Sequence, residues 1–284
     1  MAFMDSIIEC NRHDLSRFRR FLVAGQPMGW VRHDLAERLT IFPDVFVVTD
    51  DSIAMHPALR TEEERTQAFD SASVTMVQDW GVTPLKGELY PVASRWGQPA
   101  LMKMDRSMVA VFGVPSHGVH VNGLVRKPEG LFLWIGKRAL DKAVAPGKLD
   151  NIIAGGQPYN LSLMDNLVKE AAEEADVPEA LARTAKPVGL ITYVREDEWG
   201  LRPDVMFCFD LDVPQDFIPR NTDGEITEFY LMPVEKVAAL VRDTLDFKLN
   251  VNLVIIDFLV RHGFLTPDTE PDYIDIVRGL RRTV

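Results

Sequence analysis

The stretch IAGGQPYNLSLMDNLVKEAAEEA, residues 153–175, carries the clearest local pattern of the chain. It predicts a short strand that ends on Gly155 and Gly156, then a loop, then a helix from about Ser162 to Ala175. Ser162 is a suitable N-cap, because its hydroxyl can accept from a free amide of the first turn. Strand, glycine pair, loop and helix in succession indicate an α/β unit.

Three glutamates share one face of this predicted helix. Glu170, Glu173 and Glu174 stand at i, i+3 and i+4, so they fall within about 100° of arc. A separate apolar stripe suits packing on a sheet, and it consists of Met164, Val168, Ala171 and Ala175. Alone, such a helix is typical of a solvated face. Together with two glycines that let backbone approach a phosphate, the crowded carboxylates indicate a site for a hard, oxygen-preferring cation.

The charge distribution argues against nucleic acid as the main partner. The net charge is −11, and residues 151–250 carry 9 basic and 19 acidic side chains, whereas residues 101–150 carry 8 and 4. An acidic block of this kind repels polyanions. The most apolar late stretch, residues 249–260, contains Asn250, Asn252 and Asp257 and falls short of the ~20 apolar residues of a membrane helix. We therefore expect no nucleic-acid and no membrane partner, and a buried helix at residues 249–262.

Cysteine usage and the N-terminus predict a cytoplasmic protein. Cys10 and Cys208 are far apart and have no close Cys or His neighbours, which argues against a disulfide framework or a zinc site. The first residues become polar too early for a secretory signal.

A length of 284 residues suggests about two domains. Residues 1–112 have a mixed α/β pattern, with helices expected at 14–24 and 62–80. Residues 113–284 begin with a run of strand patterns and continue through the stretch above to a helix expected at 234–242. We therefore predict a smaller N-terminal α/β domain followed by a second domain.

The stretch resembles the Nudix hydrolase box, G-x5-E-x7-R-E-U-x-E-E-x-G-U, where U is aliphatic. Aligned on Gly155, the glycine, the three helical glutamates and the final aliphatic Val177 match. Leu161 replaces the first glutamate, Lys169 the arginine and Asp176 the second glycine. In typical members that glutamate and arginine hold the loop and helix together, so these replacements concern the loop more than the metal ligands.

The flanking segments, including WIGKR, APGKLDN and DGEITEFYLMP, are similar to the Nudix family related to the domain of fungal thiamine pyrophosphokinases. This resemblance implies an α/β (α+β) Nudix fold, a mixed sheet between helices, preceded by a distinct α/β domain. It also implies Mg²⁺- or Mn²⁺-dependent hydrolysis of a small organic diphosphate, thiamine diphosphate or an oxidised analogue, to the monophosphate and phosphate. Glu170, Glu173 and Glu174 would bind the metal, with Glu174 also catalytic.

Four further residues complete the predicted site. Between the two downstream glutamates Glu225 and Glu228, we favour Glu228 as a further catalytic residue. Among the basic residues, Arg138 is favoured for the diphosphate because its planar fork matches phosphate oxygens. Gly155 and Gly156 are expected to contact the substrate through their backbone.

Three alternatives remain open at this point. The altered box is compatible with a non-catalytic diphosphate-binding protein or with a diphosphate isomerase on the same fold. Hydrolysis of another nucleoside diphosphate derivative is the third, and Tyr193, sixteen residues past the box, is a weak hint of dinucleoside polyphosphates. A homodimer is left open as well.

Overall fold

The computed structural model describes residues 2–283. Its largest sheet is mixed, and the main strand order is β11-β12-β7-β8-β13, with β10 paired to β7 and β9 paired to β8. The strands are β7 (Ser116–Lys127), β8 (Gly130–Arg138), β9 (Leu149–Asn151), β10 (Ile153–Gly156), β11 (Lys186–Glu196), β12 (Leu201–Asp212) and β13 (Ile226–Pro233).

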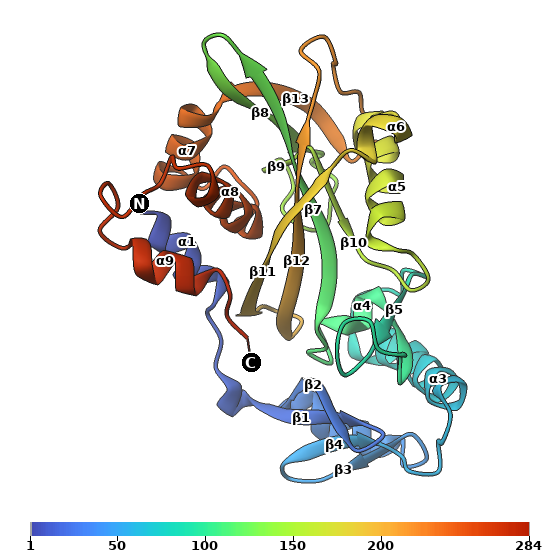
Figure 1. Ribbon diagram of the computed structural model, residues 1–284. Helices are drawn as coiled ribbons and strands as arrows, with labels where there is room; N and C mark the ends of the chain where they lie inside the picture. The colour runs from blue at the N-terminus through green and yellow to red at the C-terminus, as the bar shows by residue number, and fades with distance from the viewer. Residues whose placement is uncertain (1, 284) are drawn as a thin grey trace.

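Helices cover both faces of this sheet, as Figure 1 shows. One side holds α5 (Leu163–Ala175) and α6 (Glu179–Ala182), and the other α1 (Phe3–Cys10), α7 (Val234–Asp243), α8 (Leu249–Arg261) and α9 (Tyr273–Gly279). Because successive strand residues face opposite ways, β7 contributes Val119 and Val121 to the core under α5 and Leu124 to the core under α8. The predicted α/β class, a mixed sheet between helices, is confirmed.

The N-terminal part forms its own small sheet, in the order β2-β1-β4-β3, and a separate hairpin, β5-β6. Phe21, Phe69 and Phe112 fill its core, with the Phe69 and Phe112 rings 4.8 Å apart. Its elements are β1 (Phe18–Val23), β2 (Gln26–Arg32), α2 (His33–Arg38), β3 (Phe46–Val48), β4 (Ser52–Met55), α3 (Glu62–Trp80), β5 (Leu89–Val92), β6 (Met102–Asp105) and α4 (Arg106–Val109), with 3₁₀ turns at Leu15–Arg17 and Leu39–Ile41.

The helix predicted at residues 14–24 is wrong, because a 3₁₀ turn leads there into β1. Helix α1 lies outside the N-terminal core, since its buried Phe3 and Ile7 pack with α8 and α9. The division near residue 112 therefore remains a proposal about the sequence, and the first helix lies across it in space. Within residues 2–283, no helix is both long and apolar enough to cross a membrane.

Candidate active site

The site is built where β10 lies against α5. Gly155 pairs with Val119 of β7, and on its other side the Glu170 side chain lies directly over it. A Cβ at residue 155 would be 2.3 Å from Glu170 Cδ, so only glycine allows this contact. The neighbouring Gly156 faces the N-terminal part, where a Cβ would meet the hydroxyl of Tyr90 at 1.7 Å. The glycine pair thus lies where β10, α5 and the N-terminal part of the chain meet.

Glu174 is the buried member of the carboxylate face, with 4% of its surface exposed. The backbone N–H of Ala154 donates a 2.7 Å hydrogen bond to Glu174 Oε2. Burial raises the pKa of Glu174 well above its usual range, and that single amide only partly opposes the effect. A further positive partner beside this carboxylate would favour its ionised form.

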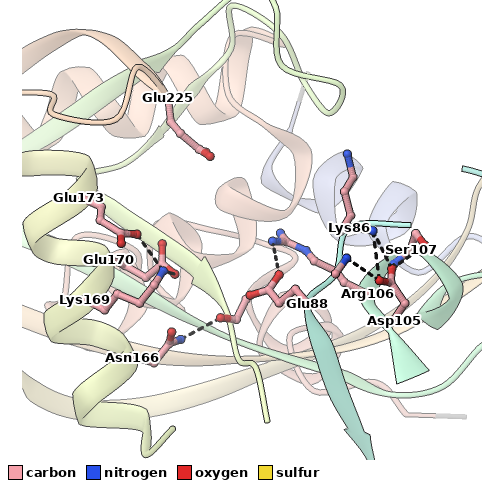
Figure 2. A network of polar contacts seen from close by, with 12 residues as sticks. Lys86, Glu88, Asp105, Arg106, Ser107, Asn166, Lys169, Glu170, Glu173 and Glu225 are labelled. Carbon is pink, nitrogen blue, oxygen red and sulfur yellow. Dashed lines mark hydrogen bonds and ion pairs between the residues drawn. The ribbon is translucent and has the colours of Figure 1, made fainter. Parts of the chain in front are cut away.

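Glu170 and Glu173 share one cation, the ammonium group of Lys169. Lys169 Nζ lies 3.2 Å from Glu170 Oε1 and 2.8 Å from Glu173 Oε2, as Figure 2 shows. Lysine at the family's arginine position therefore turns back onto its own helix. It lowers the repulsion between the two carboxylates, which is the role a bound cation would have.

The residues fit a divalent cation, although the side chains do not enclose one as they stand. Across residues 2–283, no three Asp, Glu, His or Cys side chains are gathered closely enough to hold a metal ion. The reason is local, because Lys169 lies between two of the carboxylates and the third is turned toward Ala154. Oxygen donors at i, i+3 and i+4, one of them buried, are the chemistry that Mg²⁺ or Mn²⁺ prefers.

Two buried amides hold the loop that precedes α5. Asn166 Nδ2 donates to the Gly156 carbonyl at 2.8 Å, and Gln157 Nε2 donates to the Leu161 carbonyl at 2.7 Å. Leu161 itself is 38% exposed, so its side chain does not take over the glutamate's role of holding the loop and helix together. Sequence reasoning missed both amides. The available signal was the position of Asn166 four residues before Glu170, which puts its amide on the same helix face as the carboxylates.

We predict that Asn166→Ala loosens this loop. The Gly156 carbonyl would lose its donor inside the protein, which costs roughly 1–3 kcal/mol of unfolding free energy. Urea denaturation measures the loss, and the KM for substrate should rise in parallel. Gln67→Ala, an exposed amide on α3, is the matched control and should leave both unchanged. An Asn166→Ala protein as stable as wild type would contradict the assignment.

The two downstream glutamates lie in different surroundings. On β13, Glu228 shares a face with Tyr230, which packs on the core under α7 and α8, whereas Phe229 packs under α5. Glu228 accepts hydrogen bonds from Lys137 Nζ, at 3.4 Å, and from the Tyr230 hydroxyl. The structure therefore does not bring Glu228 to the α5 carboxylates.

Glu225 is the downstream glutamate that faces α5. Burial is the main cause of the raised pKa of Glu174, and the negative charge of Glu225 adds to it. Figure 2 shows the Glu225 carboxylate directed toward the space beside Glu170 and Glu173. Lys142 Nζ pairs with Glu225 at 2.6 Å. The position of Glu225 thus favours it over Glu228 as a participant.

Arg138, the predicted diphosphate contact, is buried. Its side chain is 8% exposed, and Nη1 lies 3.0 Å from Asp150 Oδ2, while Nε donates to the Val144 carbonyl. Lys248 Nζ lies 3.5 Å from the same carboxylate oxygen. An arginine in this position stabilises the end of β8, and the structure does not present its fork to the Gly155–Gly156 backbone.

The chain is similar to known proteins over nearly its full length. Residues 2–116 match the family described as "Domain of unknown function (DUF4743)". Two Arabidopsis thaliana proteins are similar over 99% of this chain and 78% of their own length: Nudix hydrolase 24, chloroplastic, at 40% identity, and Nudix hydrolase 20, chloroplastic, at 38%. Among solved structures, the MutT protein from Methanosarcina mazei Go1 is similar over 52% of this chain and 95% of that one, at 16% identity and a TM-score of 0.39.

A carboxylate-bearing helix behind a glycine-ended strand, taken with the two plant relatives, supports a hydrolase of diphosphate-linked substrates. The chain belongs to the Nudix hydrolase family. The predicted family and enzyme class are confirmed, but the thiamine pyrophosphokinase-related branch is not shown. The predicted cytoplasmic location is wrong on this comparison, since both plant relatives are named chloroplastic. Composition could not reveal this, because a location signal need not alter the folded domain.

Proposed function

We propose that this protein hydrolyses a small organic diphosphate with the help of Mg²⁺ or Mn²⁺, and that a thiamine-type diphosphate is the first substrate to test. The observation that carries the proposal is the buried carboxylate of Glu174, which accepts from the Ala154 amide of β10 and stands on the same helix as Glu170, whose side chain lies on Gly155. Another nucleoside diphosphate derivative is the second candidate class. A homodimer and the absence of nucleic-acid and membrane partners also remain predictions.

The three helical glutamates would hold the metal, which supplies Lewis-acid stabilisation of the diphosphate oxygens and a more acidic water. Lys169 would have to leave Glu170 and Glu173 for this, and its exposed position allows it. The glycine pair lets Glu170 and Tyr90 pack directly on the β10 backbone, which holds one of the metal-binding carboxylates in place. Glu225 would accept the proton of the attacking water, and the direction of its carboxylate supports this role. Water adds to one phosphorus, the P–O–P bond breaks, and two phosphate-bearing products leave.

The test is a panel of diphosphates incubated with the full chain and analysed for all products. Thiamine diphosphate, its oxidised analogue, ADP-ribose and a dinucleoside polyphosphate cover the candidate classes. At least one should be cleaved with Mg²⁺ or Mn²⁺, and EDTA should reduce cleavage to the background rate. If no compound is cleaved while a non-hydrolysable diphosphate still binds by calorimetry, the non-catalytic alternative holds. A rearranged product without cleavage would indicate an isomerase.

A further inference from the structure

A basic residue of the N-terminal part lies beside the glycine pair. Arg106, the first residue of α4, has its guanidinium carbon 3.6 Å from the position that a Cβ would take on Gly156. It lies 5.9 Å from the centre of the Tyr90 ring, and Tyr90 is the residue that contacts Gly156. The β5-β6 hairpin and α4 therefore lie together next to β10. Figure 2 shows Glu88, Asp105 and Arg106 of this region from close by.

The backbone that carries Arg106 is firmly held. Asp105, 5% exposed, caps α4 by accepting from the Ser107 amide at 2.9 Å. The same carboxylate accepts from the Gly87 amide at 2.7 Å and from the Lys86 amide at 3.1 Å. The Arg106 amide donates to the Glu88 carbonyl at 2.8 Å. These hydrogen bonds fix the backbone position of Arg106. Its side chain therefore extends toward the site before any substrate binds.

The guanidinium group is only partly engaged. Nη1 pairs with Glu88 Oε2 at 2.9 Å, and 54% of the Arg106 side chain is exposed. Within residues 2–283, its Nε and Nη2 atoms make no hydrogen bond to the protein. Arg106 and Glu170 are also close enough for their opposite charges to attract. The arginine thus has free donors on the side of the carboxylate helix.

We propose that Arg106 binds the diphosphate of the substrate, so that the N-terminal domain completes the active site. The proposal rests on the function proposed above. A diphosphate bound beside the α5 carboxylates brings several negative charges next to Glu170, and it needs a cationic group beyond the metal. Arg138 is committed to Asp150, whereas Arg106 keeps the Nε and Nη2 donors of its planar fork free. Tyr90 positions this fork by lying between it and the strand.

The experiment compares Arg106→Ala and Arg106→Lys with wild type in the full chain. We expect Arg106→Ala to reduce kcat/KM roughly 10- to 100-fold, mainly through KM, because a charge-assisted hydrogen bond to the substrate is lost. Arg106→Lys should recover only part, since an ammonium group cannot pair bidentately. Arg60→Ala, an exposed arginine of the same domain, is the control and should behave as wild type.

Two further measurements separate this role from a structural one. If Arg106 only neutralises Glu88, the Glu88→Gln/Arg106→Gln double variant should restore kcat/KM, and that result overturns the proposal. Calorimetric binding of methylenediphosphonate with Mg²⁺ should weaken in Arg106→Ala but not in Arg60→Ala. This arm needs no turnover, so it still tests Arg106 if every compound in the panel fails to be cleaved. Equal affinity in both variants would contradict the proposal.

Discussion

Glu174→Gln should lower kcat roughly 10²- to 10³-fold, the equivalent of about 3–4 kcal/mol of transition-state stabilisation. The substitution removes the charge of the one buried carboxylate that would hold the cation. It keeps the shape of the side chain and an oxygen that can accept from the Ala154 amide, so the β10–α5 contact should survive. Steady-state kinetics at saturating Mg²⁺ measure the loss.

The same substitution should stabilise the metal-free protein at neutral pH. Burial raises the pKa of Glu174 in the folded state, so between its unfolded value of 4.5 and that raised value the folded state binds more protons. Stability therefore falls as pH rises through this window. Glutamine removes this penalty, and its advantage should vanish below about pH 4.5. Thermal melts with EDTA across this pH range measure the effect.

Mg²⁺ provides a second readout that does not depend on activity. A ligand that binds only the folded state raises stability in proportion to the logarithm of its concentration. The melting temperature of wild type should rise with Mg²⁺, and that of Glu174→Gln should rise much less. Glu179→Gln, an exposed glutamate of α6 paired with Arg183, is the matched control. Wild-type kcat in Glu174→Gln would exclude Glu174 as a metal ligand.

Elements with a strong local pattern could be predicted from the sequence. The helices at α3, α5 and α8 carry apolar spacing, caps or both, and Ser162 caps α5 as expected by accepting from the Asp165 amide. The helix prediction for residues 18–23 failed because Phe18, Phe21 and Leu22 are spaced as on a helix. Pairing with β2 and β4 overrides that spacing, and no local signal announces partners that lie elsewhere in the chain.

The site residues also separate into those set by local spacing and those set by contacts between distant parts of the chain. The face shared by Glu170, Glu173 and Glu174 follows from helix geometry, so it could be derived from spacing alone. The choice between Glu225 and Glu228 could not, because it depends on how β13 pairs with β8, and that pairing contains a register shift between Ile226 and Glu228. Arg106 was beyond reach for another reason, since only the docking of the N-terminal part brings it to Gly156.

Asp150→Ala should destabilise the protein by about 3–5 kcal/mol, the cost of leaving a buried charge unpaired. Asp150 is 1% exposed and pairs with Arg138 and Lys248. Burial alone would raise the pKa of Asp150, but Lys248, His120 and Arg138 together lower it below its usual value. Its contribution is therefore complete above about pH 3.8 and is lost as pH falls through the folded-state pKa.

Urea denaturation near pH 7 measures this loss, with Asp212→Ala as the matched control. Asp212 also has two cationic partners, Arg126 and Lys186, but its side chain is 51% exposed, so its removal should cost no more than about 1 kcal/mol. Equal losses in the two variants would contradict the buried-pair account. The Asp150→Ala/Arg138→Met double variant should recover much of the stability, because no unpaired arginine remains. An unchanged KM in that double variant would show that Arg138 supports β8 without binding substrate, whereas a raised KM would restore it as a diphosphate contact.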